Sequence, residues 1–146
     1  MVALDLVRSE SVPMWASWWL VDGLDGEHLR ELAGLSGRDP VDVGDALRRS
    51  LAELGVVTPG ISDACDEVFT FEAGRCLRHE TTEEHLVEVV ERVARASGYL
   101  KDVYDTPVGQ LYGMDDEWEG GWGRTVAELR AEVRNACATQ LEDHRA

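Results

Sequence analysis

The residues of this sequence best suited to chemistry stand in two short segments, and the first combines histidines with carboxylates. His79, Glu83 and His85 carry imidazole and carboxylate groups, which serve as general acids, general bases or metal ligands. On a helix, His79 and Glu83 are four residues apart and share a face, whereas His79 and His85 are about 240° apart. The segment therefore offers one ligand pair and not a complete site. An enzyme of unrecognised type, with a helical pocket near His79 and His85, is kept as an alternative.

The second segment, residues 111–124, mixes carboxylates, aromatic rings and glycines. Its carboxylates would receive arginine or lysine from a partner, and its aromatic rings would be buried against that partner. It lacks the alternating carboxylates and terminal glutamate of a calcium loop, so no metal site is predicted. We predict that the segment contacts another protein. The candidate residues are Tyr112, Asp115, Asp116, Glu117, Trp118, Glu119 and Trp122.

A third candidate is the tryptophan-rich stretch near the N-terminus. Trp15, Trp18 and Trp19 occupy positions i, i+3 and i+4 of a predicted helix. Three indoles on one helix cover a wide arc, so two interpretations are open. Either the rings pack into the core, or one ring stays exposed and anchors a partner, since tryptophan is favoured at binding hot spots. Trp15 and Trp19 are assigned to the predicted partner surface.

The region from residue 28 to residue 57 partly matches a helix-turn-helix motif. Ala33 and Gly37 are four residues apart and Val43 lies ten beyond Ala33, a spacing of small and apolar residues that this motif often shows. However, Asp42 and Asp45 would stand near the start of the recognition helix, where carboxylates repel phosphates. A regulator derived from a helix-turn-helix protein is therefore a second alternative, and nucleic acid is not an expected partner.

Familiar reaction centres are missing from the sequence. No nucleophile elbow, glycine-rich phosphate loop or paired zinc-ligand motif occurs. The cysteines, Cys65, Cys76 and Cys137, are odd in number and widely spaced, which predicts buried free thiols. We therefore predict no catalytic residue, metal or cofactor, and an enzyme is the less favoured class.

The elements that must position these residues are all predicted to be helices. Apolar spacing indicates a helix at residues 14–21, one capped by Asp25, one capped by Asp39, and one from Ile61. Within the last of these, residues 68–71 also fit a short strand.

Two later helices carry capping boxes, Thr81 with Glu84 and Thr125 with Glu128. Between them, residues 99–123 contain six glycines or prolines and show little periodicity. The expectation is an all-α fold: one compact, bundle-like domain over residues 1–146, with five or six helices and a long irregular segment near residues 99–123.

The stretch from Trp15 to Val56 has a tryptophan-rich start followed by VDGLDGEHLRELAGLSGRDPVDVGDALRRSLAELGV. It resembles small uncharacterised actinobacterial proteins. This resemblance implies a lineage and a helical fold, and it implies no activity and no functional residue.

Charge restricts the partners of the chain. The 146 residues include 29 acidic and 14 basic ones, for a formal net charge of −15. Such a surface repels phosphate backbones and anionic lipid headgroups, so nucleic acid and membranes are not expected partners, while cationic proteins are. The N-terminus shows no basic region followed by an apolar run, which predicts a cytoplasmic protein. The main hypothesis is an acidic, cytoplasmic, protein-binding protein, specifically an inhibitor of the immunity or antitoxin type that acts on a basic partner.

Overall fold

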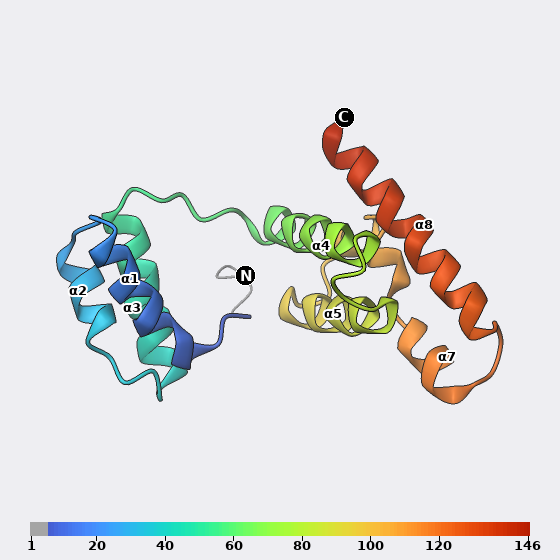
Figure 1. Cartoon of the computed structure of the whole chain (residues 1–146), viewed down its shortest axis with the longest axis horizontal. Helices are drawn as coiled ribbons and strands as arrows, with labels where there is room; N and C mark the ends of the chain where they lie inside the picture. The colour runs from blue at the N-terminus through green and yellow to red at the C-terminus, as the bar shows by residue number, and fades with distance from the viewer. Residues whose placement is uncertain (1–5) are drawn as a thin grey trace. The chain divides into compact units, whose positions relative to one another are not determined.

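The computed structural model describes residues 6–146, and these residues form helices and loops without a strand (Figure 1). The all-α class is therefore confirmed. The predicted count of five or six helices is wrong, because the described residues form eight α-helices and two short 3-10 helices. The elements are η2 (Ser9–Ser11), α1 (Val12–Val21), α2 (Glu27–Ala33), α3 (Pro40–Glu53), α4 (Ile61–Leu77), α5 (Glu83–Ala96), α6 (Lys101–Tyr104), η3 (Gly109–Leu111), α7 (Met114–Gly120) and α8 (Val126–Arg145). Residues 1–5, part of the stretch used to predict a cytoplasmic location, lie outside the described residues.

The helices belong to two compact units, where the sequence predicts one domain. The N-terminal unit contains α1 to α3 and ends at Pro59, and the C-terminal unit, Gly60–Ala146, contains α4 to α8. The residues that join them form no helix, and Val57 is 89% exposed. Helix α3 ends before Gly55, which has φ of 71°, a left-handed conformation that glycine adopts most readily. Further along, Pro59 disfavours helix at Thr58. This non-helical segment separates the two units.

The N-terminal unit has a small aliphatic core between its three helices. Asp39 caps α3, as predicted, by accepting hydrogen bonds from the backbone N–H groups of Val41 and Asp42. Asp25 does not cap α2. The N-cap is Gly26, which has no side chain, so the free amides are satisfied from elsewhere. The buried core residues are Val12, Ala16, Leu29, Leu32, Val43, Ala46 and Leu47.

The amides at the start of α2 are bound by the last residue of α3. Glu53 Oε1 accepts a hydrogen bond from the N–H of Glu27 at 2.8 Å, and Oε2 accepts one from the N–H of His28 at 3.0 Å. A carboxylate is favoured at this position because the start of a helix carries partial positive charge. This contact ties α2 to α3 across 25 residues of sequence.

In the C-terminal unit, the structure tests two predicted helix starts and one predicted alternative to helix. Thr125 and Glu128 form the predicted capping box of α8. The predicted capping box of Thr81 with Glu84 is wrong, because the N-cap of α5 is Thr82, whose hydroxyl accepts a hydrogen bond from the N–H of His85 at 3.1 Å. The residues 68–71 lie inside α4, so the strand interpretation is wrong.

The segment that we predicted to be irregular instead contains α6, η3 and α7. Each piece is three to seven residues long, too short to show a clear helical period. Gly113 and Gly121, with φ of 83° and 61°, bound α7 in the left-handed conformation that glycine adopts most readily. The glycines therefore interrupt helix at short intervals and do not leave the segment unstructured.

Candidate functional site

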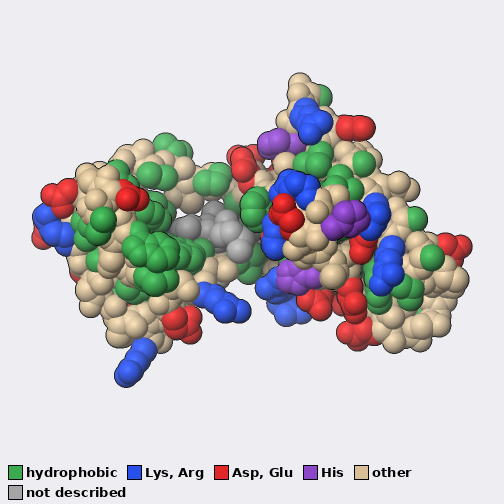
Figure 2. Space-filling view, viewed as in Figure 1, with side chains coloured by type: hydrophobic (Ala, Val, Ile, Leu, Met, Phe, Trp, Pro, Cys, Tyr) green, Lys and Arg blue, Asp and Glu red, His purple; other side chains and the backbone are tan. Residues whose placement is uncertain are grey.

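Helices α5 and α7 bring carboxylates from two parts of the chain to either side of one small hollow. Glu84 and Glu88 are one turn apart on α5, and Asp115 and Glu119 are one turn apart on α7, so each pair shares a helix face. Together with Val87 and the indole of Trp118, these four side chains line a hollow of about 20 Å³, which we call the acidic hollow. Figure 2 shows acidic side chains gathered around α5 and α7 on this face of the C-terminal unit.

No internal arginine or lysine neutralises the acidic hollow within residues 6–146. The contact recorded there joins Glu88 Oε2 to His85 Nδ1, 3.4 Å apart, and it is an ion pair only when His85 is protonated. Glu84, Asp115 and Glu119 pair with no cation of the described chain, although arginine pairs are formed elsewhere in the same unit. The hollow therefore presents negative charge around an apolar ring, an arrangement that suits a cationic side chain from outside.

Glu117, also predicted to contact a partner, is instead bound to Arg124. Its side chain is only 12% exposed, and Oε2 accepts a hydrogen bond from Arg124 Nη2 at 2.7 Å. Oε1 accepts from the backbone N–H of Arg124 at 2.6 Å, and the guanidinium group also pairs with Glu132. These hydrogen bonds lower the pKa of Glu117 from 4.5 to about 2. Glu117 thus holds α7 to the start of α8.

Acid is expected to release this attachment. Because the pKa of Glu117 in the folded protein is below its unfolded value, the ion pair stabilises the fold at pH values above that unfolded value. This contribution is lost as the pH falls from about 4.5 towards 2. The backbone amide resonance of Arg124, followed by NMR during acidification, should shift with a midpoint near 2. The variant Glu117→Gln should lack this transition, and a midpoint near 4.5 in the unaltered protein would contradict the assignment.

Tyr112, another predicted site residue, belongs to a cluster of three tyrosines. Its ring lies edge-to-face with that of Tyr104, at a centroid distance of 5.1 Å and an interplanar angle of 76°. It also meets the ring of Tyr99, at 6.4 Å and 81°. Sequence analysis missed Tyr99 and Tyr104, because their spacing fits no helix face and short glycine-bounded turns bring them together. The three residues are called the tyrosine cluster.

Glu91 links the tyrosine cluster to the acidic hollow. Its Oε1 accepts a hydrogen bond at 2.8 Å from the N–H of Gly113, the residue after Tyr112. Burial raises the pKa of Glu91, and the neighbouring Asp115 and Asp116 raise it further. Since Asp115 also lines the acidic hollow, the two features share one surface of the C-terminal unit.

The remaining predicted residues of the second segment lie at the surface around α7. Asp116 is exposed, and the indole of Trp122 is 63% exposed. Trp118 is half-buried beside the hollow. Of the seven candidates in residues 111–124, six are therefore accessible in part, and Glu117 is held by the chain itself.

In the N-terminal unit, the exposed indole is not one of the two assigned to the partner surface. Trp15 and Trp19 are half-buried and pack against the aliphatic core, whereas Trp18 is 55% exposed. Met14 and Val21 are also exposed and lie on the same side of α1 as Trp18, at i, i+4 and i+7 spacing. Trp15 and Trp19 thus serve the core, and Trp18 is the tryptophan of α1 that a partner would meet.

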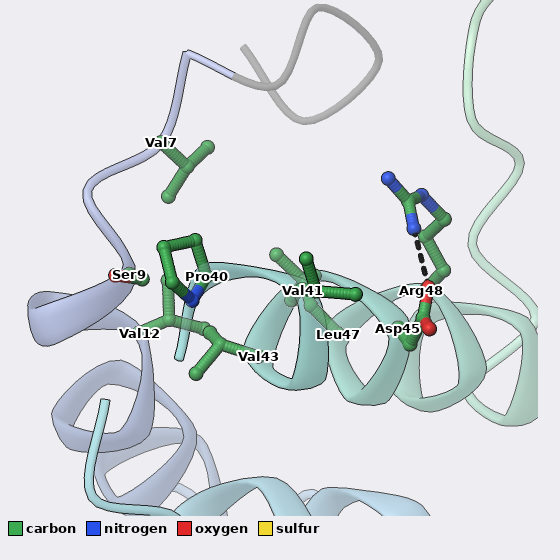
Figure 3. Close-up of a pocket in the computed structure, with 10 residues that line it drawn as sticks. Val7, Ser9, Val12, Pro40, Val41, Val43, Asp45, Leu47 and Arg48 are labelled. Atoms are coloured by element: carbon green, nitrogen blue, oxygen red, sulfur yellow. Dashed lines mark hydrogen bonds and ion pairs between the residues drawn. The ribbon is translucent and has the colours of Figure 1, made fainter. Parts of the chain in front are cut away.

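The largest hollow that we describe lies in the same unit, against α3. It measures about 300 Å³ and is lined mainly by aliphatic side chains, with Asp45 and Arg48 2.8 Å apart at one end (Figure 3). On α3, Asp45 pairs with Arg48 and Glu31 of α2 pairs with Arg49. Both arginines of the would-be recognition helix are thus already bound to carboxylates, which disfavours contacts to DNA phosphates.

The histidine segment forms a structural network. Arg134 Nε donates a hydrogen bond to Glu83 Oε1 at 2.6 Å, and its Nη2 lies 3.5 Å from His79 Nδ1. His85 pairs with Glu88 instead, and neither histidine lines the hollows described above. Among the described residues, no group of three or more His, Cys, Asp or Glu side chains could hold a metal ion. The geometry therefore gives no support to a catalytic pocket near His79 and His85.

His79 also carries backbone strain that a substitution should relieve. It follows α4 with φ of 60°, and the N–H groups of His79 and Glu80 bond back to Cys76 and Arg75 at 3.0 and 2.9 Å. This is the helix ending in which glycine is favoured. His79→Gly is expected to raise the free energy of unfolding by about 1 kcal/mol, because glycine adopts the left-handed conformation without steric cost. Urea denaturation would measure this, with His79→Ala as the control that loses the ring and keeps the strain. Equal stability of the two variants would contradict the prediction.

The three cysteines are buried and free, as predicted. Burial raises the pKa of Cys65, Cys76 and Cys137, which keeps the thiols protonated and unreactive.

No protein-family model matches this chain, and comparisons with curated proteins and with solved structures also find no match. Separately, none of the helices in residues 6–146 combines the length and the apolar character needed to cross a membrane.

Proposed function

We propose that this chain is a protein-binding protein and that it recognises a basic partner through the acidic hollow. The observation that carries the proposal is the meeting of α5 and α7, which holds four carboxylates around one indole with no arginine or lysine of the described chain paired to them. An incoming arginine or lysine would be attracted by the negative charge that these side chains place around the hollow. The half-buried Trp118 would add apolar contact at the centre.

The surroundings of the hollow support the same kind of partner. Asp116 and Trp122 extend the acidic and aromatic surface around α7. The net charge of −15 would speed association with a cationic protein and reject anionic ones. In its specific form, the proposal is an inhibitor of the immunity or antitoxin type that acts on a basic protein in the cytoplasm.

A basic peptide provides a direct test. The probe is a short peptide that contains both lysine and arginine, and its binding is measured by calorimetry at low salt. The triple variant Glu84→Gln, Glu88→Gln, Glu119→Gln is expected to weaken binding about tenfold, since each exposed ion pair contributes roughly 0.5 kcal/mol. Added salt should weaken binding to the unaltered protein more than binding to this variant.

The matched control removes the same charge from another place. Glu67, Glu142 and Asp143 are exposed residues of α4 and α8 outside the acidic hollow. Glu67→Gln, Glu142→Gln, Asp143→Asn should leave most of the affinity intact. If both triple variants lose affinity equally, the peptide responds to net charge alone and the proposal is wrong.

A further inference from the structure

The tyrosine cluster differs from an ordinary aromatic core in its exposure. Tyr99 is 55% exposed and Tyr112 is 42% exposed, so much of two rings faces solvent. The rings nevertheless hold nearly perpendicular orientations, with Tyr112 common to both pairs. Such an arrangement presents the negative faces of aromatic rings in more than one direction, as sites that bind organic cations do.

The backbone conformation at Tyr99 is one in which a tyrosine is less stable than a glycine or an asparagine would be. Tyr99 has φ of 61° and directly follows Gly98, which has φ of 70°. A left-handed conformation costs a tyrosine roughly 1–2 kcal/mol, and glycine or asparagine would avoid most of that cost. Strain of this kind is often found at binding sites, where it fixes a side chain in place.

Two carboxylates stand beside the rings without a cation. Glu91 accepts a hydrogen bond from the N–H of Gly113, the residue after Tyr112, and Asp115 lies two residues beyond Gly113. Neither carboxylate forms an ion pair with any residue in 6–146. The nearest lysine in sequence, Lys101, is bound to Asp105 at 2.6 Å. The cation–π contact recorded for the described residues joins Arg75 to Phe71 and involves none of these tyrosines. The cluster thus combines aromatic faces with uncompensated negative charge.

We propose that the tyrosine cluster, with Glu91 and Asp115, binds the guanidinium group of an arginine from the protein partner. A guanidinium is planar and weakly hydrated, so its face stacks on a tyrosine while its N–H groups bind carboxylate oxygens. Lysine has a compact, strongly hydrated ammonium group and gains less from an aromatic face. This inference rests on the proposed function and names the side chain that the partner supplies.

The test compares two peptides on the whole protein: a short peptide of alternating glycine and arginine, and its lysine counterpart. NMR titration should show the arginine peptide binding about threefold more tightly, with shifts of the tyrosine ring resonances. Tyr112→Leu should abolish this preference, and Tyr112→Phe, which keeps the ring, should retain it. Glu84→Gln, Glu88→Gln, Glu119→Gln should weaken both peptides by the same factor.

A second variant, Tyr99→Asn, removes a ring of the cluster without destabilising the fold, because asparagine tolerates the left-handed conformation. It should be at least as stable as the unaltered protein in urea and should reduce the preference for arginine. Equal affinities of the two peptides for the unaltered protein, or an unchanged preference in both Tyr99→Asn and Tyr112→Leu, would overturn the arginine assignment alone. Failure of both peptides to bind would overturn the proposed function with it.

Discussion

Gly109→Ala is expected to lower the free energy of unfolding of the C-terminal unit by about 3 kcal/mol, the range of overpacked core substitutions. A Cβ at this position would overlap the backbone oxygen of Val103 and would lie 2.7 Å from its carbonyl carbon. The Thr106 hydroxyl, 2.6 Å from that Cβ, already accepts a hydrogen bond from the N–H of Gly109. Because two of the three obstacles are backbone atoms, no rotation of a side chain can relieve the overlap.

Gly109→Ala should also disturb the tyrosine cluster. Gly109 begins η3, which in the sequence stands between two members of the tyrosine cluster, Tyr104 and Tyr112. Displacing η3 should change the ring resonances of both tyrosines as well as the denaturation midpoint followed by circular dichroism. Gly44→Ala in α3 is the control, since a Cβ there meets only the end of the Arg48 side chain at 3.8 Å and alanine favours the helix. Equal stability changes in the two variants would contradict the steric explanation.

The helix starts that were predicted correctly depend on interactions between residues close together in the sequence. Asp39 and the pair Thr125–Glu128 cap helices that begin at or next to them, so the responsible residues stand together in the sequence. The cap of α2 was predicted wrongly because its carboxylate comes from Glu53, at the other end of α3. Periodicity shows that a helix has an apolar face but not which helix covers it, so two separate cores were taken for one domain.

In the candidate site too, the residues that were predicted stand together in the sequence, and those that were missed come from elsewhere in the chain. Composition alone indicated the acidic and aromatic residues of the second segment, including Tyr112 and Trp118. It did not indicate Glu84 and Glu88, which become part of the site only because α5 packs beside α7. It also placed Glu117 at the surface, since an ion pair with Arg124, seven residues away across a glycine-rich turn, has no sequence pattern of its own.

Gln140→Leu should be comparably damaging, because Gln140 is the one fully buried glutamine side chain among the described residues and uses both ends of its amide. Its Nε2 donates hydrogen bonds to Asp66 Oδ1 at 2.6 Å and Thr70 Oγ1 at 3.2 Å, both on α4. Its Oε1 accepts from the backbone N–H of Val108, at 3.3 Å. The amide therefore joins α8 to α4 and to the turn that precedes η3.

Leucine has a similar volume, so the loss should come from the partners left unsatisfied and not from a cavity. A buried N–H without an acceptor costs about 1–3 kcal/mol, and Val108 is fully buried. With the loss of the donor to the Asp66 carboxylate, the total is expected to be about 3 kcal/mol in urea denaturation. Gln110→Leu, at an exposed glutamine of the same unit, should change stability by no more than about 0.5 kcal/mol. Hydrogen exchange at the Val108 amide should accelerate in Gln140→Leu alone, whereas equal protection in both variants would show that Gln140 does not hold this turn.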